Sequence, residues 1–232
     1  MSADRIIDEL KEMGISITSE EANIFERYRE EILEVNRFLN LTSIRDSGEF
    51  VTKHITDSAF LCSLEEVAGK VIDVGTGGGF PGVAVAVLKP ECELTLLDST
   101  GKKLRAVEKI FSELGLKASF LTARAEDIGR RDYRERFDTV ISRAVADLPK
   151  LAEYCIPLLS AGGYMLAMKG PSYGEELERS MSAINILGGK LAGCKEYMLG
   201  DGSGRCIIKI RKIKDTPETY PRSGNLIKNK PL

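Results

Sequence analysis

The segment Val71-Ile-Asp-Val-Gly75-Thr-Gly77-Gly-Gly79-Phe-Pro-Gly82 joins strand-compatible residues to a cluster of glycines. The apolar run from Val83 to Leu88 follows directly and predicts a helix. Glycine lets the backbone turn with a positive φ and pass close to a ligand that a Cβ would repel. The first N–H groups of the next helix would point at the same ligand. The segment therefore predicts a cofactor site at the end of the first strand of an α/β sheet.

Two kinds of cofactor site use a turn of this type. The dinucleotide pattern G-x-G-x-x-G is present at Gly77, Gly79 and Gly82. However, Pro81 interrupts it, and the tight turn is expected to begin earlier, at Gly75. The better description is an acid, Asp73, followed by alternating glycines. In this form the loop resembles that of methyltransferases that use S-adenosyl-L-methionine (SAM), so we expect SAM as the cofactor.

Asp98 ends the next predicted strand, Glu93–Asp98. It follows the glycine loop by about 20 residues, the spacing at which an acid binds a ribose diol in α/β cofactor folds. A carboxylate can accept a hydrogen bond from each of the two hydroxyls. The alternative is a cap of the helix that begins near Lys102. The two roles are compatible.

Length and composition favour one domain with an extension. The chain has 232 residues, of which 43% are hydrophobic, so it can bury a full core. It lacks an apolar run near the roughly 18 residues of a membrane span, and its first residues do not resemble a signal peptide. Its five cysteines form no C-x-x-C pair, which is typical of reduced thiols in a cytoplasmic protein. Because His54 is the single histidine, no metal site is expected.

Three regions are expected along the chain. Residues 1–68 predict a helical extension that packs on the main domain, beginning with a capping-box pattern at Thr18 and Glu21. Residues 69–214 alternate strands and helices, which is typical of a doubly wound, mostly parallel α/β sheet. Seven strands are expected, the last two antiparallel, at 70–74, 93–98, 118–122, 137–142, 163–168, 194–199 and 205–211. This pattern resembles the Rossmann-like sheet of class I SAM-dependent methyltransferases.

Residues 215–232 predict a basic, extended tail. The net charge of the chain is only −2, but residues 209–232 hold seven basic side chains and two acidic ones. Proline and glycine are interleaved with these charges, which disfavours a helix. Such a tail can contact phosphates, or it can be a solvated terminus that keeps the protein soluble. Charge alone leaves both interpretations open.

A series of short motifs carries a closer resemblance. It includes Lys53-His-Ile-Thr-Asp57-Ser58, the glycine loop, Leu97-Asp-Ser99, Ala125-Glu126, Ser142-Arg-Ala144, Lys169-Gly170, and Tyr220-Pro-Arg222 ending in Lys228-Asn-Lys-Pro-Leu232. In this order they resemble the bacterial small-subunit ribosomal RNA guanine-N7 methyltransferases, also called the glucose-inhibited division protein B family. One departure is Val35, where the family usually has a tryptophan.

The resemblance implies an activity. Members of this family methylate N7 of a guanine in the decoding-region loop of 16S rRNA with SAM, so 16S rRNA or the small ribosomal subunit is the expected partner, and a monomer is expected. Two alternatives stay open: a SAM-dependent methyltransferase of a small molecule, and a SAM- or RNA-binding module without activity. The small-molecule enzyme would leave the basic tail unexplained.

The resemblance also implies site residues. The expected cofactor-binding residues are Gly75, Gly77, Gly79, Phe80, Asp98, Ala125, Glu126 and Arg143. Arg143 and Lys169 are the expected catalytic residues, and Arg143 is predicted to matter for catalysis more than for folding. The expected RNA-binding residues are Lys53, His54, Arg222, Lys228 and Lys230.

Each of four assignments has a structural alternative. Glu126 is also explained as a first-turn acid on a helix dipole, and Arg143 by an ion pair with Asp147. Lys169 is also explained as a surface lysine. His54 is also explained as a satisfied helix or core residue rather than a catalyst.

Overall fold

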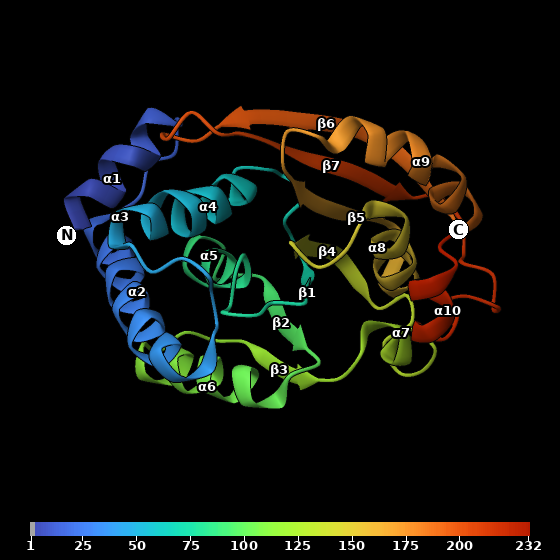
Figure 1. The fold of residues 1–232 in the computed structure, drawn as a ribbon, viewed down its shortest axis with the longest axis horizontal. Coiled ribbons are helices and arrows are strands. Elements are labelled where there is room, and N and C mark those ends of the chain that lie inside the picture. The colour runs from blue at the N-terminus through green and yellow to red at the C-terminus, as the bar shows by residue number, and fades with distance from the viewer. Residues whose placement is uncertain (1–2) are drawn as a thin grey trace.

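The chain folds around one seven-stranded sheet (Figure 1). The computed structural model describes residues 3–232. The strand order is β3-β2-β1-β4-β5-β7-β6, with β5/β7 and β6/β7 antiparallel and the other pairs parallel. The strands are β1 Lys70–Val74, β2 Glu93–Asp98, β3 Ser119–Thr122, β4 Phe137–Arg143, β5 Leu159–Lys169, β6 Gly189–Met198 and β7 Gly204–Lys212. The predicted doubly wound α/β sheet is confirmed.

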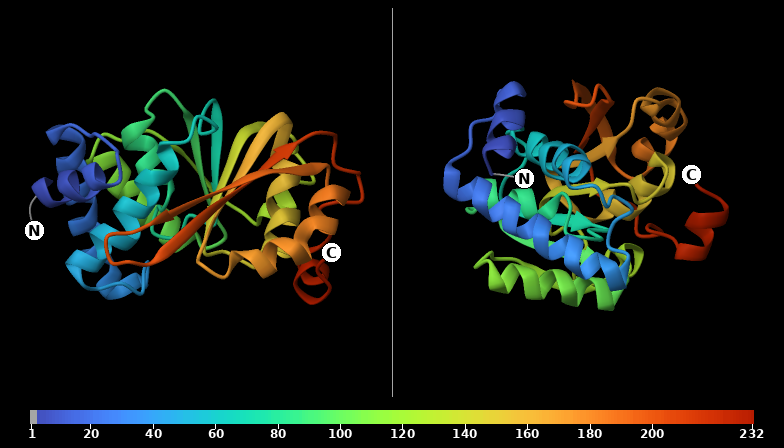
Figure 2. Two further views of the ribbon diagram at one scale, coloured as in Figure 1. Left: turned by 90° about the horizontal axis from the view of Figure 1, so that it is seen from above. Right: turned by 60° about the vertical axis from the view of Figure 1, so that its left-hand side comes forward.

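Helices cover both faces of the sheet (Figures 1 and 2). The face that carries the N-terminal helices is packed by α1 Ala3–Glu12, α2 Ser19–Leu39, α3 Ser47–Phe50, the π-helix η1 Val51–Thr56, α4 Asp57–Cys62, α5 Gly82–Leu88 and α6 Gly101–Glu113. The other face is packed by α7 Ala125–Ile128, α8 Leu148–Cys155, the 3₁₀-helix η2 Ile156–Leu158, α9 Tyr173–Ile186 and α10 Gly224–Asn229. The predicted N-terminal helical extension is therefore present and shares a core with the sheet.

The central strands are apolar on both faces because helices bury both faces. Successive side chains of a strand point to opposite sides of the sheet. Val71 accordingly packs in the core under the N-terminal helices, and Ile72 packs in the core under α8 and α9. The near-continuous hydrophobic run of β1 is thus what a strand covered on both sides requires.

Helix α2 connects the N-terminal layer to the glycine loop. Its N-terminus has the predicted capping box, in which Glu21 N–H donates to the Thr18 hydroxyl and the Glu21 carboxylate accepts from Thr18 N–H. Its apolar stripe includes Phe25 and Tyr28, both fully buried. The Tyr28 hydroxyl donates a hydrogen bond of 2.8 Å to the Gly78 carbonyl. One face of the glycine loop is therefore fixed by the N-terminal layer.

The glycine loop is held at both ends by hydrogen bonds to the Asp73 side chain. One oxygen of this fully buried carboxylate accepts hydrogen bonds from the Thr76 hydroxyl at 2.7 Å and from Gly82 N–H at 2.9 Å. The loop is therefore closed on the strand from which it departs. Burial raises the pKa of Asp73 to about 6, and the two hydrogen bonds oppose that rise.

The C-terminal segment differs from the predicted extended tail. Residues 224–229 form helix α10, which contacts α8 and lies beside α7 and α8 in Figure 1. Lys212, one of the seven basic side chains of residues 209–232, is fully buried at the end of β7 and pairs with Glu135 at 3.1 Å. Charge and proline content did not predict this packing because it depends on a single apolar residue, Ile227, which is buried in α10.

No helix among residues 3–232 combines the length and apolarity needed to cross a membrane.

Gly79 provides a test of the contact between loop and N-terminal layer. Its φ is +85°, and a Cβ there would lie 1.9 Å from the Tyr28 hydroxyl oxygen. Gly115 has a φ of +69° with nothing within 4 Å, so it is a matched control. We expect Gly115→Ala to lower the free energy of unfolding by about 1–2 kcal/mol, from backbone strain alone. Gly79→Ala should cost roughly 1–3 kcal/mol more through overpacking.

Chemical denaturation of the wild type, Gly79→Ala, Tyr28→Phe and the double variant Gly79→Ala/Tyr28→Phe measures the contribution of this contact. Removing the hydroxyl removes the closest contact, so Gly79→Ala should cost less in the Tyr28→Phe background than in the wild type. Equal costs in the two backgrounds would show that the contact does not limit this position.

Candidate functional site

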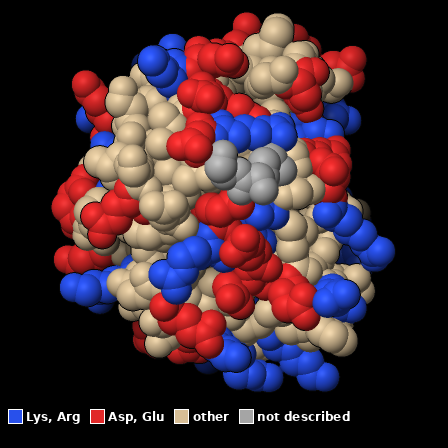
Figure 3. All heavy atoms as spheres, turned by 90° about the vertical axis from the view of Figure 1, so that its left-hand side faces the viewer, with Lys and Arg blue, Asp and Glu red and all other residues tan. Residues whose placement is uncertain are grey.

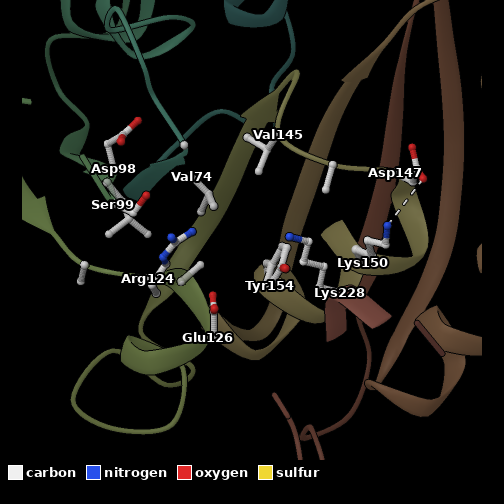
Figure 4. Close-up of a pocket in the computed structure, with 15 residues that line it drawn as sticks. Val74, Asp98, Ser99, Arg124, Glu126, Val145, Asp147, Lys150, Tyr154 and Lys228 are labelled. Carbon is white, nitrogen blue, oxygen red and sulfur yellow. Dashed lines mark ion pairs between the residues drawn. The ribbon is translucent and has the colours of Figure 1, made fainter. Parts of the chain in front are cut away.

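The first cavity lies at the carboxyl ends of β1, β2 and β4 and has a volume of about 370 Å³ (Figure 4). This size is in the range of small-molecule sites. The position is where open α/β sheets bind ligands. Its lining comes from five parts of the chain: Val74, Gly75, Leu97, Asp98, Ser99, Ala123, Arg124, Ala125, Glu126, Val145, Ala146, Asp147, Lys150, Tyr154 and Lys228.

Asp98 lies in this cavity as predicted. Its Oδ2 accepts from Gly77 N–H at 3.0 Å, and its Oδ1 accepts from Thr100 N–H at 2.7 Å. Each carboxylate oxygen has a second lone pair, so both can accept one further hydrogen bond. The two backbone N–H groups therefore fix the orientation of the carboxylate.

The predicted glycines divide into two groups. Gly75 lines the cavity, and a Cβ there would lie 2.4 Å from Cγ2 of Val145. Gly77 adjoins the cavity through its hydrogen bond to Asp98. Gly79 instead faces Tyr28. Phe80 lies outside this cavity, 4% exposed, so the structure gives the last two a packing role toward the N-terminal layer.

Ala125 and Glu126 begin α7 and also line the first cavity. Glu126 is 8% exposed. Its Oε1 lies 2.1 Å from the position that a Cβ on Gly224 would occupy. The carboxylate is therefore packed between α7 and the C-terminal segment, which an isolated first-turn acid would not be.

A second cavity, of about 490 Å³, adjoins the same edge of the sheet. Four of its lining side chains are cations and one is an acid. The lining residues are Ile44, Lys53, His54, Asp57, Arg143, Ala144, Met168, Lys169, Gly170 and Arg205. The structure thus separates Arg143 from the predicted cofactor residues that line the first cavity and places it with Lys53, His54 and Lys169.

Arg143 is held by residues of η1 and α4. Its Nη1 donates to the Asp57 carboxylate at 3.1 Å and to the Lys53 carbonyl at 2.8 Å. Its guanidinium lies 5.4 Å from the centre of the Phe80 ring, a cation–π contact. The predicted alternative, a pair with Asp147, is not formed. Asp147 instead lies 4.0 Å from Lys150.

Asp57 binds more than one partner. Its side chain is 5% exposed, accepts from the Tyr197 hydroxyl at 2.6 Å, and lies 3.8 Å from Arg205. Burial raises the pKa of Tyr197, so this hydroxyl remains protonated and donates. Asp57 therefore joins η1 and α4 to β4, β6 and β7.

His54 is a satisfied neutral residue in the wall of the second cavity. Its Nδ1 accepts from Arg143 at 2.7 Å, because a guanidinium can only donate. The proton is then on Nε2, which donates to the Thr42 hydroxyl at 2.6 Å. The ring stacks on Phe80 with centroids 4.7 Å apart. Burial, and then the charge of Arg143, lowers the pKa of His54 to about 3.

The loop after β4 forms the wall between the two cavities. Arg143 and Ala144 line the second cavity, whereas Val145 to Asp147 line the first. Ala144 has a φ of +57°, in the left-handed region that few non-glycine residues adopt. Lys169 supports this loop by donating to the Ala146 carbonyl at 2.8 Å, and it pairs with Glu176 at 2.7 Å. Lys169 is therefore not a free surface lysine.

The predicted RNA-binding residues do not form one group. Lys53 lines the second cavity and pairs with Glu49. Arg222 forms two hydrogen bonds of 2.8 and 2.7 Å with the buried Glu153, so it is not a free tail cation. Lys228 lines the first cavity, and Lys230 is exposed. Arg222 is therefore held by Glu153, and its contact with an RNA phosphate stays a prediction.

Several cavity residues escaped the sequence analysis. Arg124, Tyr154 and Lys150 line the first cavity, and Arg205 lines the second. Asp57 could have been found, because it lies in the motif Lys53–Ser58 quoted above. Tyr154 follows Lys150 by one helical turn, a spacing that places both on one face of α8.

Charge is mixed on the face of the N-terminal layer. Figure 3 shows acidic groups interrupting basic groups across this face, so the visible surface is not a continuous basic area. Among residues 3–232, no group of three or more histidine, cysteine, aspartate or glutamate side chains is arranged to hold a metal ion.

Comparisons with known proteins agree with this architecture. A SAM-dependent methyltransferase from Leishmania major superposes with a TM-score of 0.55 at 12% identity, covering 79% of this chain and 82% of that chain. NSun6 from Pyrococcus horikoshii superposes with a TM-score of 0.54 at 17% identity, covering 68% of this chain and 51% of the other. At these identities the similarity shows the fold alone.

Sequence relatives are closer. A family model described as rRNA small subunit methyltransferase G matches residues 21–200. The ribosomal RNA small subunit methyltransferase G of Desulfitobacterium hafniense is 43% identical, covering 95% of this chain and 93% of the relative. The ribosomal RNA small subunit methyltransferase G of Pelotomaculum thermopropionicum is 42% identical, covering 99% of this chain and 98% of the relative. With both cavities at the carboxyl edge of a class I sheet and this identity over nearly its full length, the chain belongs to the rRNA small subunit methyltransferase G family.

Proposed function

We propose that this protein transfers the methyl group of SAM to N7 of a guanine in the decoding-region loop of 16S rRNA, acting as a monomer in the cytoplasm. The observation that carries the proposal is the pair of cavities that share the 143–147 loop. One cavity holds an acid suited to a ribose diol, and the other is rich in cations suited to RNA. The methyl group would pass across the edge of the shared loop.

The first cavity fits SAM by its donor set. Asp98 presents two oxygens with free lone pairs to a diol, and Leu97 and Ala123 offer apolar surface to a purine. Glu126 can accept a hydrogen bond from an exocyclic amine. When bound, SAM supplies an electrophilic methyl group on a positively charged sulfur. The chain's task is to hold the acceptor in line with it.

The proposed acceptor atom requires no general base. Guanine N7 carries a lone pair in the ring plane, so it can be alkylated without first losing a proton. His54 cannot act as a base without giving up its bonds, since Arg143 and Thr42 occupy both ring nitrogens. Alignment and electrostatics are therefore the proposed sources of catalysis.

The second cavity supports an RNA substrate. Lys53, Arg143 and Arg205 provide positive charge that suits a phosphate or the guanine O6. In A-form RNA the N7 edge faces a groove too narrow for side chains, so the guanine must be in a loop or flipped out. A small-molecule acceptor would leave this excess of cations unexplained, and a non-catalytic module would not need two adjoining cavities.

Methyl transfer from tritium-labelled SAM tests the proposed function. We expect label in 16S rRNA of small subunits that lack the modification and none in free guanosine. Borohydride reduction and aniline should then cleave the labelled RNA at a single 7-methylguanosine. Label at another atom or only in small molecules would contradict the proposal.

The cofactor site is tested by Asp98→Ala. This change removes two charge-assisted hydrogen bonds to the ribose, so we expect the Kd for SAM to rise at least about 30-fold, equivalent to about 2 kcal/mol. Calorimetry measures the Kd, with the exposed Asp127→Ala in α7 as control. An unchanged Kd for Asp98→Ala would remove Asp98 from the site.

The role of Arg143 can be separated from its ion pair. Arg143→Ala leaves the buried Asp57 carboxylate without its guanidinium at 3.1 Å, so we expect a loss of about 3 kcal/mol of stability. Arg143 is thus expected to contribute to stability as well as to catalysis. In Arg143→Ala/Asp57→Asn the buried negative charge of Asp57 is absent as well, so most of the stability should return.

Methyl transfer by the double variant should nevertheless remain at least about tenfold below wild type, equivalent to about 1.4 kcal/mol. Denaturation and single-turnover kinetics measure the two properties, with Asp57→Asn alone as the control for neutralisation. Recovery of both stability and methyl transfer in the double variant would make Arg143 a structural partner of Asp57 only.

His54 predicts a pH dependence of stability. Its pKa in the folded protein is about 3, below the ordinary 6.5, so only the unfolded chain gains this proton between these values. The stability contributed by neutral His54 is therefore lost as the pH falls through this window. Relative to His54→Gln, the wild type should lose about 2 kcal/mol between pH 7.5 and pH 5.

Urea denaturation of both proteins across this range measures the difference. The opposite trend from Asp73, whose pKa is raised, is common to both proteins and cancels. Because the chain has one histidine, no other imidazole contributes. Parallel stability curves for the two proteins would show that His54 titrates normally in the fold.

A further inference from the structure

We propose that residues 220–232, here called the C-terminal strap, form a wall of the cofactor cavity and that the Lys228 ammonium donates a hydrogen bond to the nucleoside part of bound SAM. This inference rests on the proposed function in one respect, namely that the first cavity takes SAM. It assigns to the strap a role in cofactor binding in place of the phosphate contact predicted from its charge.

The strap is anchored at its start by three arginines. The Arg222 guanidinium and its backbone N–H both donate to Glu153, whose side chain is 0% exposed. Arg130 donates to the Pro221 carbonyl at 2.7 Å, and Arg134 donates to the Tyr220 carbonyl at 2.7 Å. Breaking such a buried pair is strongly unfavourable, so the strap has a fixed position.

The middle of the strap lies directly on a predicted cofactor residue. Gly224 begins α10, and a Cβ there would meet Glu126 Oε1 at 2.1 Å. One turn later, Ile227 is fully buried. The Glu126 wall of the cavity and the strap are therefore in contact without space for a methyl group between them.

Lys228 follows Ile227 and lines the cavity. Figure 4 shows its side chain on another side of the cavity from Asp98. In the part of the chain that the structure describes, Lys150 lies 4.0 Å from Asp147, whereas no carboxylate lies within 4.0 Å of the Lys228 ammonium. Lys228 thus presents hydrogen-bond donors that the protein itself does not engage in an ion pair.

The position of Lys228 in the cavity indicates that it contacts the nucleoside part of SAM. Lys228 lies one helical turn after Gly224, which packs against Glu126, whereas Gly75 and the loop after β4 belong to other parts of the lining. Purine ring nitrogens are acceptors, and an ammonium has only donors. A ring nitrogen of adenine is therefore the proposed partner of Lys228.

Paired variants of two lysines in the strap test this. Lys230 is exposed and lies outside the cavity, so Lys230→Met is the matched control for Lys228→Met. Calorimetry with SAM and with 5′-methylthioadenosine, which lacks the amino-acid part, should show at least about a tenfold rise in Kd for Lys228→Met with both ligands, the effect of one charge-assisted hydrogen bond. Lys230→Met should leave both Kd values unchanged.

A second pair tests the wall itself. Gly224→Ala places a methyl group against Glu126 and should raise the Kd for both ligands, whereas Gly174→Ala, at a helical glycine with nothing within 4 Å, should not. Melting temperatures of the free proteins show whether any variant is unfolded.

The outcomes separate the inference from the proposed function. A wild-type protein that does not bind SAM would contradict the proposed function itself. Wild-type binding with equal Kd values for Lys228→Met and Lys230→Met would overturn the inference alone. If Lys228→Met raises the Kd for SAM but not for 5′-methylthioadenosine, the nucleoside assignment is overturned. If Lys228→Met weakens rRNA binding without changing the Kd for SAM, Lys228 is an RNA contact instead.

Discussion

The buried carboxylate of Asp73 is the constraint on which both cavities depend. It accepts hydrogen bonds from the beginning of the glycine loop, at Thr76, and from its end, at Gly82. A Cβ on Gly82 would meet Leu96 Cδ2 at 2.2 Å, so only glycine lets α5 start this close to the sheet. The loop can then turn above β1, where Gly77 N–H orients Asp98 and Gly78 accepts from Tyr28. The glycine loop therefore contacts the first cavity on one side and the N-terminal layer on the other.

The two cavities also depend on the loop after β4, which separates them. Its N-terminal end, Arg143, is fixed by Asp57 from the N-terminal layer, and its C-terminal half is fixed by Lys169 from β5. Between these attachments Ala144 adopts a left-handed φ, and the chain passes from one cavity to the other. Such strain persists only where surrounding contacts determine it. A methyltransferase needs two ligands at a fixed separation, and a wall attached at both ends provides it.

Prediction from the sequence succeeded where local pattern determines structure. The order of strands and helices, the capping box at Thr18 and the position of Asp98 at a strand end all follow from periodicity and spacing, and the structure has them. It did not succeed where partners lie far apart in the chain. Asp57 and Arg143 are separated by 86 residues, and Arg222 and Glu153 by 69. A charge by itself does not reveal whether its partner is a phosphate, a cofactor or a buried carboxylate.

The C-terminal segment shows how composition can mislead. Basic residues interleaved with proline and glycine are typical of a solvated tail, yet Arg222 lies on a fully buried acid and Ile227 is in the core. A buried carboxylate such as Glu153 costs several kcal/mol to desolvate unless a cation satisfies it, so Glu153 in α8 requires the strap as much as the strap requires Glu153. Since α8 also supplies Lys150 and Tyr154 to the first cavity, the ion pair couples the position of the strap to the shape of that cavity.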